Sequence, residues 1–240
     1  MNIPPEIFQA SVLVVAHPDD EVLWFSSVLA RVERAIICYE DCDDLPEIGA
    51  ARRRAMTDYP LSTVAWLRRP EPGSVEGADW SAAIATPYGM ALNAEPADEP
   101  RAARYRSAYD VLRADVRAQL RGARHVFTHN PWGEYGHPDH VQLSRVVADL
   151  RPELGFRLWY SSYVSPRSMA FAARTLPELG THLRLPTDAA LVARIKAHYQ
   201  RCNAWTWHPD HEQFADEAWL EDTGTPPATG AVLPLHCVMT

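Results

Sequence analysis

The stretch that most constrains the fold is Ser11–Glu21, which reads Ser-Val-Leu-Val-Val-Ala-His-Pro-Asp-Asp-Glu. Its apolar, β-branched first half is typical of a strand that is buried on both faces. The proline after His17 restricts that histidine to an extended conformation, so the strand can continue through it. Apolar residues then recur at helical spacing from Asp19 or Asp20 onward. We therefore expect His17, Asp19 and Asp20 to lie together where a strand passes into a helix.

The rest of the chain alternates between strand and helix patterns. Further strands are predicted over 34–39, 61–67 and 125–128, and helices over 46–58, 101–121 and from 137 onward. This order predicts an α/β fold: a single domain spanning 1–240, with a mostly parallel, Rossmann-like sheet and helices on both faces. The proline-rich segment 68–100 is expected to be less regular and could act as a lid. Residues 203–240 are expected to form an irregular tail.

Composition excludes several classes of partner. The formal net charge is −8, which disfavours nucleic acid or an anionic membrane surface as the main partner. No apolar run approaches the roughly 20 residues that a membrane-spanning helix needs, so we expect no membrane insertion. The first ten residues lack the pattern of a signal peptide, and four scattered cysteines do not suggest a disulfide framework. We therefore expect a cytoplasmic protein with a small-molecule substrate.

A second polar motif follows the strand predicted at 125–128. After a loop with two glycines, the chain reads His137-Pro-Asp-His140 and then continues as an amphipathic helix. His137 and His140 are three residues apart at the helix start, so their rings should point to the same side. If the two strand-to-helix junctions meet at one edge of the sheet, His17, Asp20 and one of these histidines would converge. Three such ligands with an open fourth position are typical of catalytic zinc.

Other interpretations of these patterns remain open. Acidic residues in a first helical turn also satisfy free backbone N–H groups and the helix dipole. A second His-x-x-His, at His208 and His211, follows tryptophans rather than a strand, and we interpret it as a surface turn. The sequence contains no Gly-x-Ser-x-Gly nucleophile motif, and its first strand-to-helix turn has no glycine. Serine hydrolase and dinucleotide-binding functions are therefore disfavoured.

The two motifs together resemble a known enzyme family. The segments Ala16–Glu21 and Gly136–His140 are similar to those of the PIG-L/LmbE family of zinc-dependent N-acetylglucosaminyl deacetylases. The resemblance extends over about residues 10–150. It implies a metal-dependent hydrolase that removes the acetyl group from an N-acetylated amino sugar or glycoconjugate. A zinc amidase of another sugar-linked amide, or a non-catalytic zinc-containing carbohydrate-binding module, is the alternative.

The resemblance also implies roles for individual residues. His17, Asp20 and His140 would bind one zinc ion per chain. Asp19 would be the general base, and a protonated His137 would act as an acid or stabilise an oxyanion.

Substrate contacts are expected from three further side chains. Arg52 would correspond to an arginine of the family, although the glutamate that usually follows three residues later is replaced by Ala55. Trp132 and Tyr135 lie in the 129–136 loop, one of the loops expected to determine specificity.

Overall fold

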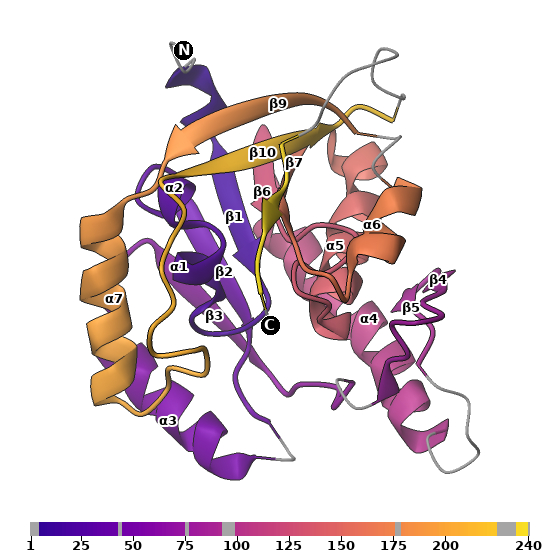
Figure 1. Ribbon diagram of the computed structural model, residues 1–240, viewed down its shortest axis with the longest axis horizontal. Helices are drawn as coiled ribbons and strands as arrows, with labels where there is room; N and C mark the ends of the chain where they lie inside the picture. The colour runs from indigo at the N-terminus through magenta and orange to yellow at the C-terminus, as the bar shows by residue number, and fades with distance from the viewer. Residues whose placement is uncertain are drawn as a thin grey trace.

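The computed structural model of the chain describes residues 5–42, 45–74, 77–92, 99–175, 179–224 and 234–239. Its centre is a seven-stranded sheet with the order β3-β2-β1-β6-β7-β10-β9 (Figure 1). The first five strands in this order are parallel, and β10 is antiparallel to both β7 and β9. The predicted, mostly parallel α/β sheet is therefore confirmed. The strands are β1 (Ser11–Val15), β2 (Arg34–Tyr39), β3 (Val64–Arg69), β6 (His125–Thr128), β7 (Arg157–Ser161), β9 (Leu179–Pro186) and β10 (Asp216–Asp222).

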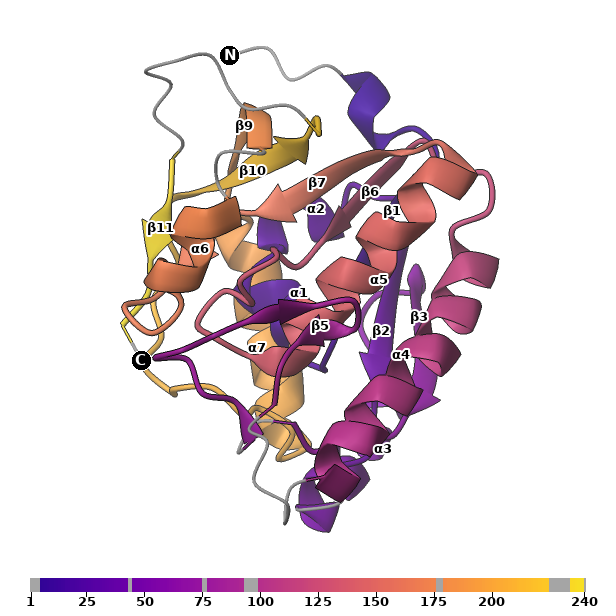
Figure 2. The same ribbon diagram turned by 90° about the vertical axis from the view of Figure 1, so that its right-hand side faces the viewer.

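Helices cover both faces of this sheet, as expected (Figures 1 and 2). One face packs against α1 (Asp20–Leu23), α2 (Ser26–Leu29), α3 (Pro46–Thr57) and α7 (Ala189–Arg201). The other face packs against α4 (Glu99–Gln119), α5 (Pro138–Leu154) and α6 (Met169–Thr175). None of the helices in the described part of the chain combines the length and apolar character needed to cross a bilayer.

Short elements complete the fold. They are the 3₁₀ helix η1 (Pro5–Phe8), the hairpin of β4 (Ala85–Thr86) and β5 (Gly89–Met90), and the pair of β8 (Tyr163–Val164) and β11 (His236–Cys237). The hairpin lies within segment 68–100, parts of which fall outside the described residues. Its predicted role as a lid stays a prediction. The expectation that 203–240 is irregular is wrong for β10, which lies between two other strands of the central sheet.

The strand order reverses between β1 and β6. The chain proceeds outward from β1 to β2 and β3, then crosses back through α4 to place β6 on the other side of β1. Ser11 pairs with His125 and Val14 with Thr128, so the two strands end side by side. In open α/β sheets, ligands bind beyond the carboxyl ends of strands at this kind of reversal. The two motifs of the sequence follow these two strands.

The helix predicted from Asp19 or Asp20 is divided into α1 and α2. The division is stabilised by Glu217 of β10, whose carboxylate is fully buried. One carboxylate oxygen accepts hydrogen bonds from the backbone N–H and hydroxyl of Ser26, at 3.0 and 2.7 Å. The other accepts from the same groups of Ser27, at 2.9 and 2.6 Å. A distant strand thus supplies the N-terminal cap of α2.

Candidate metal centre

Three predicted ligands converge beyond the ends of β1 and β6. His17 Nδ1 lies 3.3 Å from Asp20 Oδ2, and His140 Nε2 lies 3.2 Å from the same oxygen. The two ring nitrogens are 3.3 Å apart, and all three side chains are buried. Zinc with nitrogen and oxygen ligands at about 2.0–2.1 Å in tetrahedral geometry separates those ligands by about 3.3 Å. The size of this triangle therefore fits a zinc ion.

Surrounding hydrogen bonds orient the lone pairs of the triad toward one another. His140 Nδ1 lies 2.8 Å from Glu134 Oε2, and a proton held there leaves the Nε2 lone pair for a metal ion when one binds. His17 Nε2 lies 3.3 Å from Asp139 Oδ2, and a proton held there leaves the Nδ1 lone pair for a metal ion when one binds. Asp20 Oδ2 is held by the backbone N–H of His17 at 2.7 Å. Carboxylates that orient histidines in this way are typical of the surroundings of metal ligands.

His129 is also close to the triad and forms a group of possible metal ligands with Asp20 and His140. Its Nε2 lies 3.4 Å from Asp20 Oδ2, yet this nitrogen accepts the backbone N–H of Ala16 at 3.0 Å. Its Nδ1 is paired with Glu134 at 2.9 Å, and its ring stacks on His140 at 3.8 Å. His129 therefore supports His140. The sequence analysis missed both His129 and Glu134, although their position in the loop after β6 was a signal that they lie at this junction.

Nearby carboxylates make the triad favourable for a cation. Burial by itself lowers the pKa of His17, but the carboxylates of Glu71, Asp139 and Asp20 outweigh it and raise that pKa to about 9. Glu71, which lies 3.5 Å from His17 Nε2, is a further residue that the sequence analysis did not identify. Positive charge at the centre of the triad would thus be stabilised from two sides.

The Asp19 carboxylate lies beside the triad and is held by a distant segment. Its Oδ2 accepts hydrogen bonds from the backbone N–H and the hydroxyl of Thr206, at 2.9 and 2.8 Å. No described residue donates a hydrogen bond to Oδ1, so this oxygen is free to accept a proton. Burial and the negative charge of Asp20 raise the pKa of Asp19 to about 7. A carboxyl group with this pKa can exchange a proton near neutral pH.

The backbone of Asp19 is held in an unusual conformation. Its φ is 91°, in the region that favours glycine. The backbone N–H of Asp19 donates to Glu21 Oε2 at 3.0 Å, and the hydroxyl of Tyr199 donates to Glu21 Oε1 at 2.7 Å. Glu21 thus fixes the turn in which Asp19 and Asp20 lie.

His137 also lies beside the triad, at the N-cap of α5. Its ring centroid is 4.6 Å from that of His17 and 4.7 Å from that of His140. Its Nδ1 accepts the backbone N–H of Asp139 at 3.2 Å, which places the proton on Nε2. Burial, with the positive charge of His17 and His140, lowers the pKa of His137 well below its usual value. The structure therefore favours a neutral ring that donates from Nε2, in place of the expected protonated ring.

A cavity of about 600 Å³ opens onto these groups. Of the three expected substrate contacts, Arg52 and Tyr135 line it, and Arg52 is ion-paired with Glu71. Trp132 does not line it, because its fully buried ring lies in the core and donates from Nε1 to Tyr163 O at 2.7 Å. The cavity is lined by His17, Asp19, Asp20, Leu23, Cys42, Leu45, Ile48, Arg52, Glu71, Gly73, Tyr135, His137, Thr206 and Trp207.

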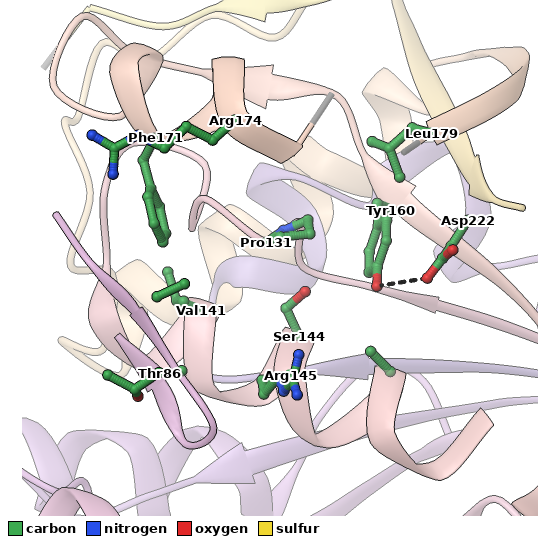
Figure 3. Close-up of a pocket in the computed structure, with 13 residues that line it drawn as sticks. Thr86, Pro131, Val141, Ser144, Arg145, Tyr160, Phe171, Arg174, Leu179 and Asp222 are labelled. Carbon is green, nitrogen blue, oxygen red and sulfur yellow. Dashed lines mark hydrogen bonds between the residues drawn. The ribbon is translucent and has the colours of Figure 1, made fainter. Parts of the chain in front are cut away.

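A second cavity, of about 360 Å³, lies between α5, α6 and the end of β10 (Figure 3). Its only lining carboxylate among the described residues is Asp222, which is paired with Arg151 at 2.7 Å. Asp222 also accepts a hydrogen bond from the Tyr160 hydroxyl at 3.3 Å. No described cluster of possible metal ligands includes a residue of this cavity. It is therefore not a second candidate metal centre.

The second His-x-x-His is also separate from the metal centre. His208 and His211 line a different surface hollow, beside Phe214. The His211 ring lies 6.0 Å from Trp24, and neither histidine belongs to a described cluster of possible ligands.

Comparison with known proteins places this site in context. The profile of PIG-L, the GlcNAc-PI de-N-acetylase family, matches residues 12–150, whereas no curated protein matches the sequence. The fold resembles a deacetylase–teicoplanin complex at 15% identity, with a TM-score of 0.53 over 88% of this chain and 97% of that one. It also resembles the zinc-inhibited form of teicoplanin deacetylase, at 14% identity and a TM-score of 0.55 over 88% of this chain and 97% of that one. The A40926 pseudoaglycone deacetylase is similar at 14% identity, with a TM-score of 0.53 over 87% of this chain and 95% of that one. Because the family match covers more than half of the sequence and includes both motifs, the chain belongs to the PIG-L family.

Proposed function

We propose that this protein is a zinc-dependent N-deacetylase that hydrolyses the acetamide of an N-acetylated amino sugar or glycoconjugate and releases acetate. The observation that carries the proposal is the triangle of His17 Nδ1, Asp20 Oδ2 and His140 Nε2, with sides of 3.2–3.3 Å. One cation placed between these three atoms would contact all of them at ordinary zinc–ligand distances. Two histidines and one carboxylate are also a donor set used by catalytic zinc.

Zinc bound by this triad would lower the pKa of a bound water and polarise the amide carbonyl. Asp19 would act as the general base: Oδ1 accepts the proton of the attacking water, while Thr206 holds Oδ2. The same carboxyl would then deliver a proton to the leaving amine.

His137 would stabilise the developing oxyanion from outside the triad. Its Nδ1 already accepts the Asp139 N–H, so Nε2–H is the group that can donate to the oxygen. A neutral donor in this position adds no positive charge next to the metal ion.

Metal content and acetate release test the proposal together. Wild-type protein should contain about one zinc per chain and release acetate from at least one member of a panel of N-acetylated sugars. His140→Ala should lose both, because it removes one corner of the triad. A matched control, His208→Ala, removes an exposed histidine of the same motif outside the cavity and should keep both properties. A wild-type protein that neither contains nor takes up zinc would overturn the proposal.

Asp19→Asn separates an enzyme from a zinc-containing binding module. The amide cannot accept the proton, so turnover should fall by roughly 10²–10⁴-fold while zinc stays bound. Hydrolysis at the wild-type rate in this variant would show that Asp19 is not the base.

A further inference from the structure

The wall of the metal cavity that is formed by α3 changes character along its length. A row of three residues lines the cavity: Leu45 at the N-cap position just before α3, then Ile48 and Arg52, which are four residues apart on one side of the helix. Arg52 is buried, Ile48 is partly buried, and Leu45 is 50% exposed. The row therefore leads from a charged group in the interior to apolar groups at the mouth.

Apolar side chains from two other segments line the same cavity. Leu23 comes from α1, and Trp207 comes from the segment between α7 and β10. The Trp207 ring is held 5.2 Å from Trp24 and 4.7 Å from Tyr135, yet it stays partly exposed. Exposed apolar surface of this kind beside a polar site is typical of a place where a ligand binds.

The charges of the cavity argue against an anionic substrate. Among the described residues that line it, the only permanently positive side chain is Arg52. That guanidinium is already paired with Glu71 and donates to the carbonyl of Glu40 at 3.3 Å. The carboxylates of Asp19 and Asp20 also line the cavity. A phosphate on the substrate would find no unpaired cation there and would face several negative groups.

We propose that the substrate is a neutral N-acetylated amino sugar that carries an apolar substituent, with the sugar in the polar interior and the apolar group against Leu45, Ile48 and Trp207 at the mouth. The proposal rests on the N-deacetylase function proposed above. It narrows the range of substrates, because the part of the substrate that does not react would be an apolar group bound at the mouth of the cavity.

A chain-length series of substrates tests this assignment. Acetate release by the zinc-loaded protein would be measured with the methyl, butyl and octyl glycosides of N-acetylglucosamine below their micellar concentrations. The value of kcat/KM should rise about tenfold from methyl to octyl, as expected from burying roughly two methylene groups. N-acetylglucosamine 1-phosphate should react about tenfold more slowly than the methyl glycoside, because its charge would lie near carboxylates.

Two variants locate the effect. Leu45→Ser should lower the octyl-to-methyl ratio of kcat/KM several-fold, because it replaces an apolar group at the mouth. Ile84→Ser changes another exposed apolar residue, 60% exposed, that does not line the cavity, and it should keep the wild-type ratio.

Each outcome has a distinct meaning. Turnover of all glycosides with a flat chain-length profile would overturn the apolar-substituent proposal and leave the deacetylase function standing. A rising profile that Leu45→Ser leaves unchanged would also overturn it, because the apolar group would then bind elsewhere. If the zinc-loaded protein hydrolyses neither these glycosides nor any other N-acetylated sugar, the proposed function itself is overturned.

Discussion

At the scale of single residues, the position of Asp19 depends on Thr206. The two residues are 187 positions apart in the sequence, yet Thr206 provides both hydrogen bonds to Asp19 Oδ2. These bonds leave Oδ1 as the oxygen that can take a proton. Thr206 is itself exposed, so its side chain contributes little to the core. We therefore interpret Thr206 as a residue that positions the proposed base.

Thr206→Val removes the hydroxyl and keeps the backbone N–H donor. We expect kcat to fall about tenfold, the effect of losing one hydrogen bond to a charged group, while KM changes little. Thr206→Ser restores the hydroxyl and should recover most of the activity. Steady-state kinetics of both variants would check this, and a Val variant with wild-type kcat would contradict the positioning role.

At the scale of secondary-structure elements, local patterns predict some parts of the fold and not others. The predicted strand at 34–39 coincides with β2, and the predicted helix at 46–58 differs from α3 by one residue. Apolar spacing was sufficient for these elements. β10 could not be recognised in this way, because its buried face includes the charged residue Glu217. The break between α1 and α2 could not be predicted from local sequence either, because the carboxylate that caps α2 belongs to Glu217 of β10.

Glu217 should therefore stabilise the fold as well as the local helix start. Glu217→Ala leaves two backbone N–H groups and two hydroxyls of Ser26 and Ser27 without their buried acceptor. We expect the free energy of unfolding to fall by on the order of 3 kcal/mol in denaturant titrations. As a control on the same strand, Glu221→Ala removes a partly exposed ion pair with Arg157 and should change it by less than about 1 kcal/mol. Equal effects of the two variants would contradict this role of Glu217.

At the scale of the whole molecule, the candidate metal centre joins two parts of the chain through the strand reversal. His17 and Asp20 follow β1, whereas His140 follows β6, and parallel pairing of these strands brings the three together. The sequence was sufficient to expect this meeting, because both motifs follow strands of a parallel sheet. It was not sufficient to find Glu71 or Thr206, which reach the cavity from other segments without a recognisable local pattern.

Because the triad connects these two junctions, zinc should stabilise the whole domain. Zinc that binds only the folded protein adds stability in proportion to its occupancy, about 2.7 kcal/mol at one hundred times the dissociation constant. Removing it with a chelator should lower the Tm of the wild type by roughly 5–10 °C for a chain of this size, and adding zinc should reverse the change. The Tm of His140→Ala should not change when chelator is added, because that variant lacks one of the three proposed zinc ligands. A wild-type Tm that stays constant while zinc is removed would mean that the ion does not connect the two junctions.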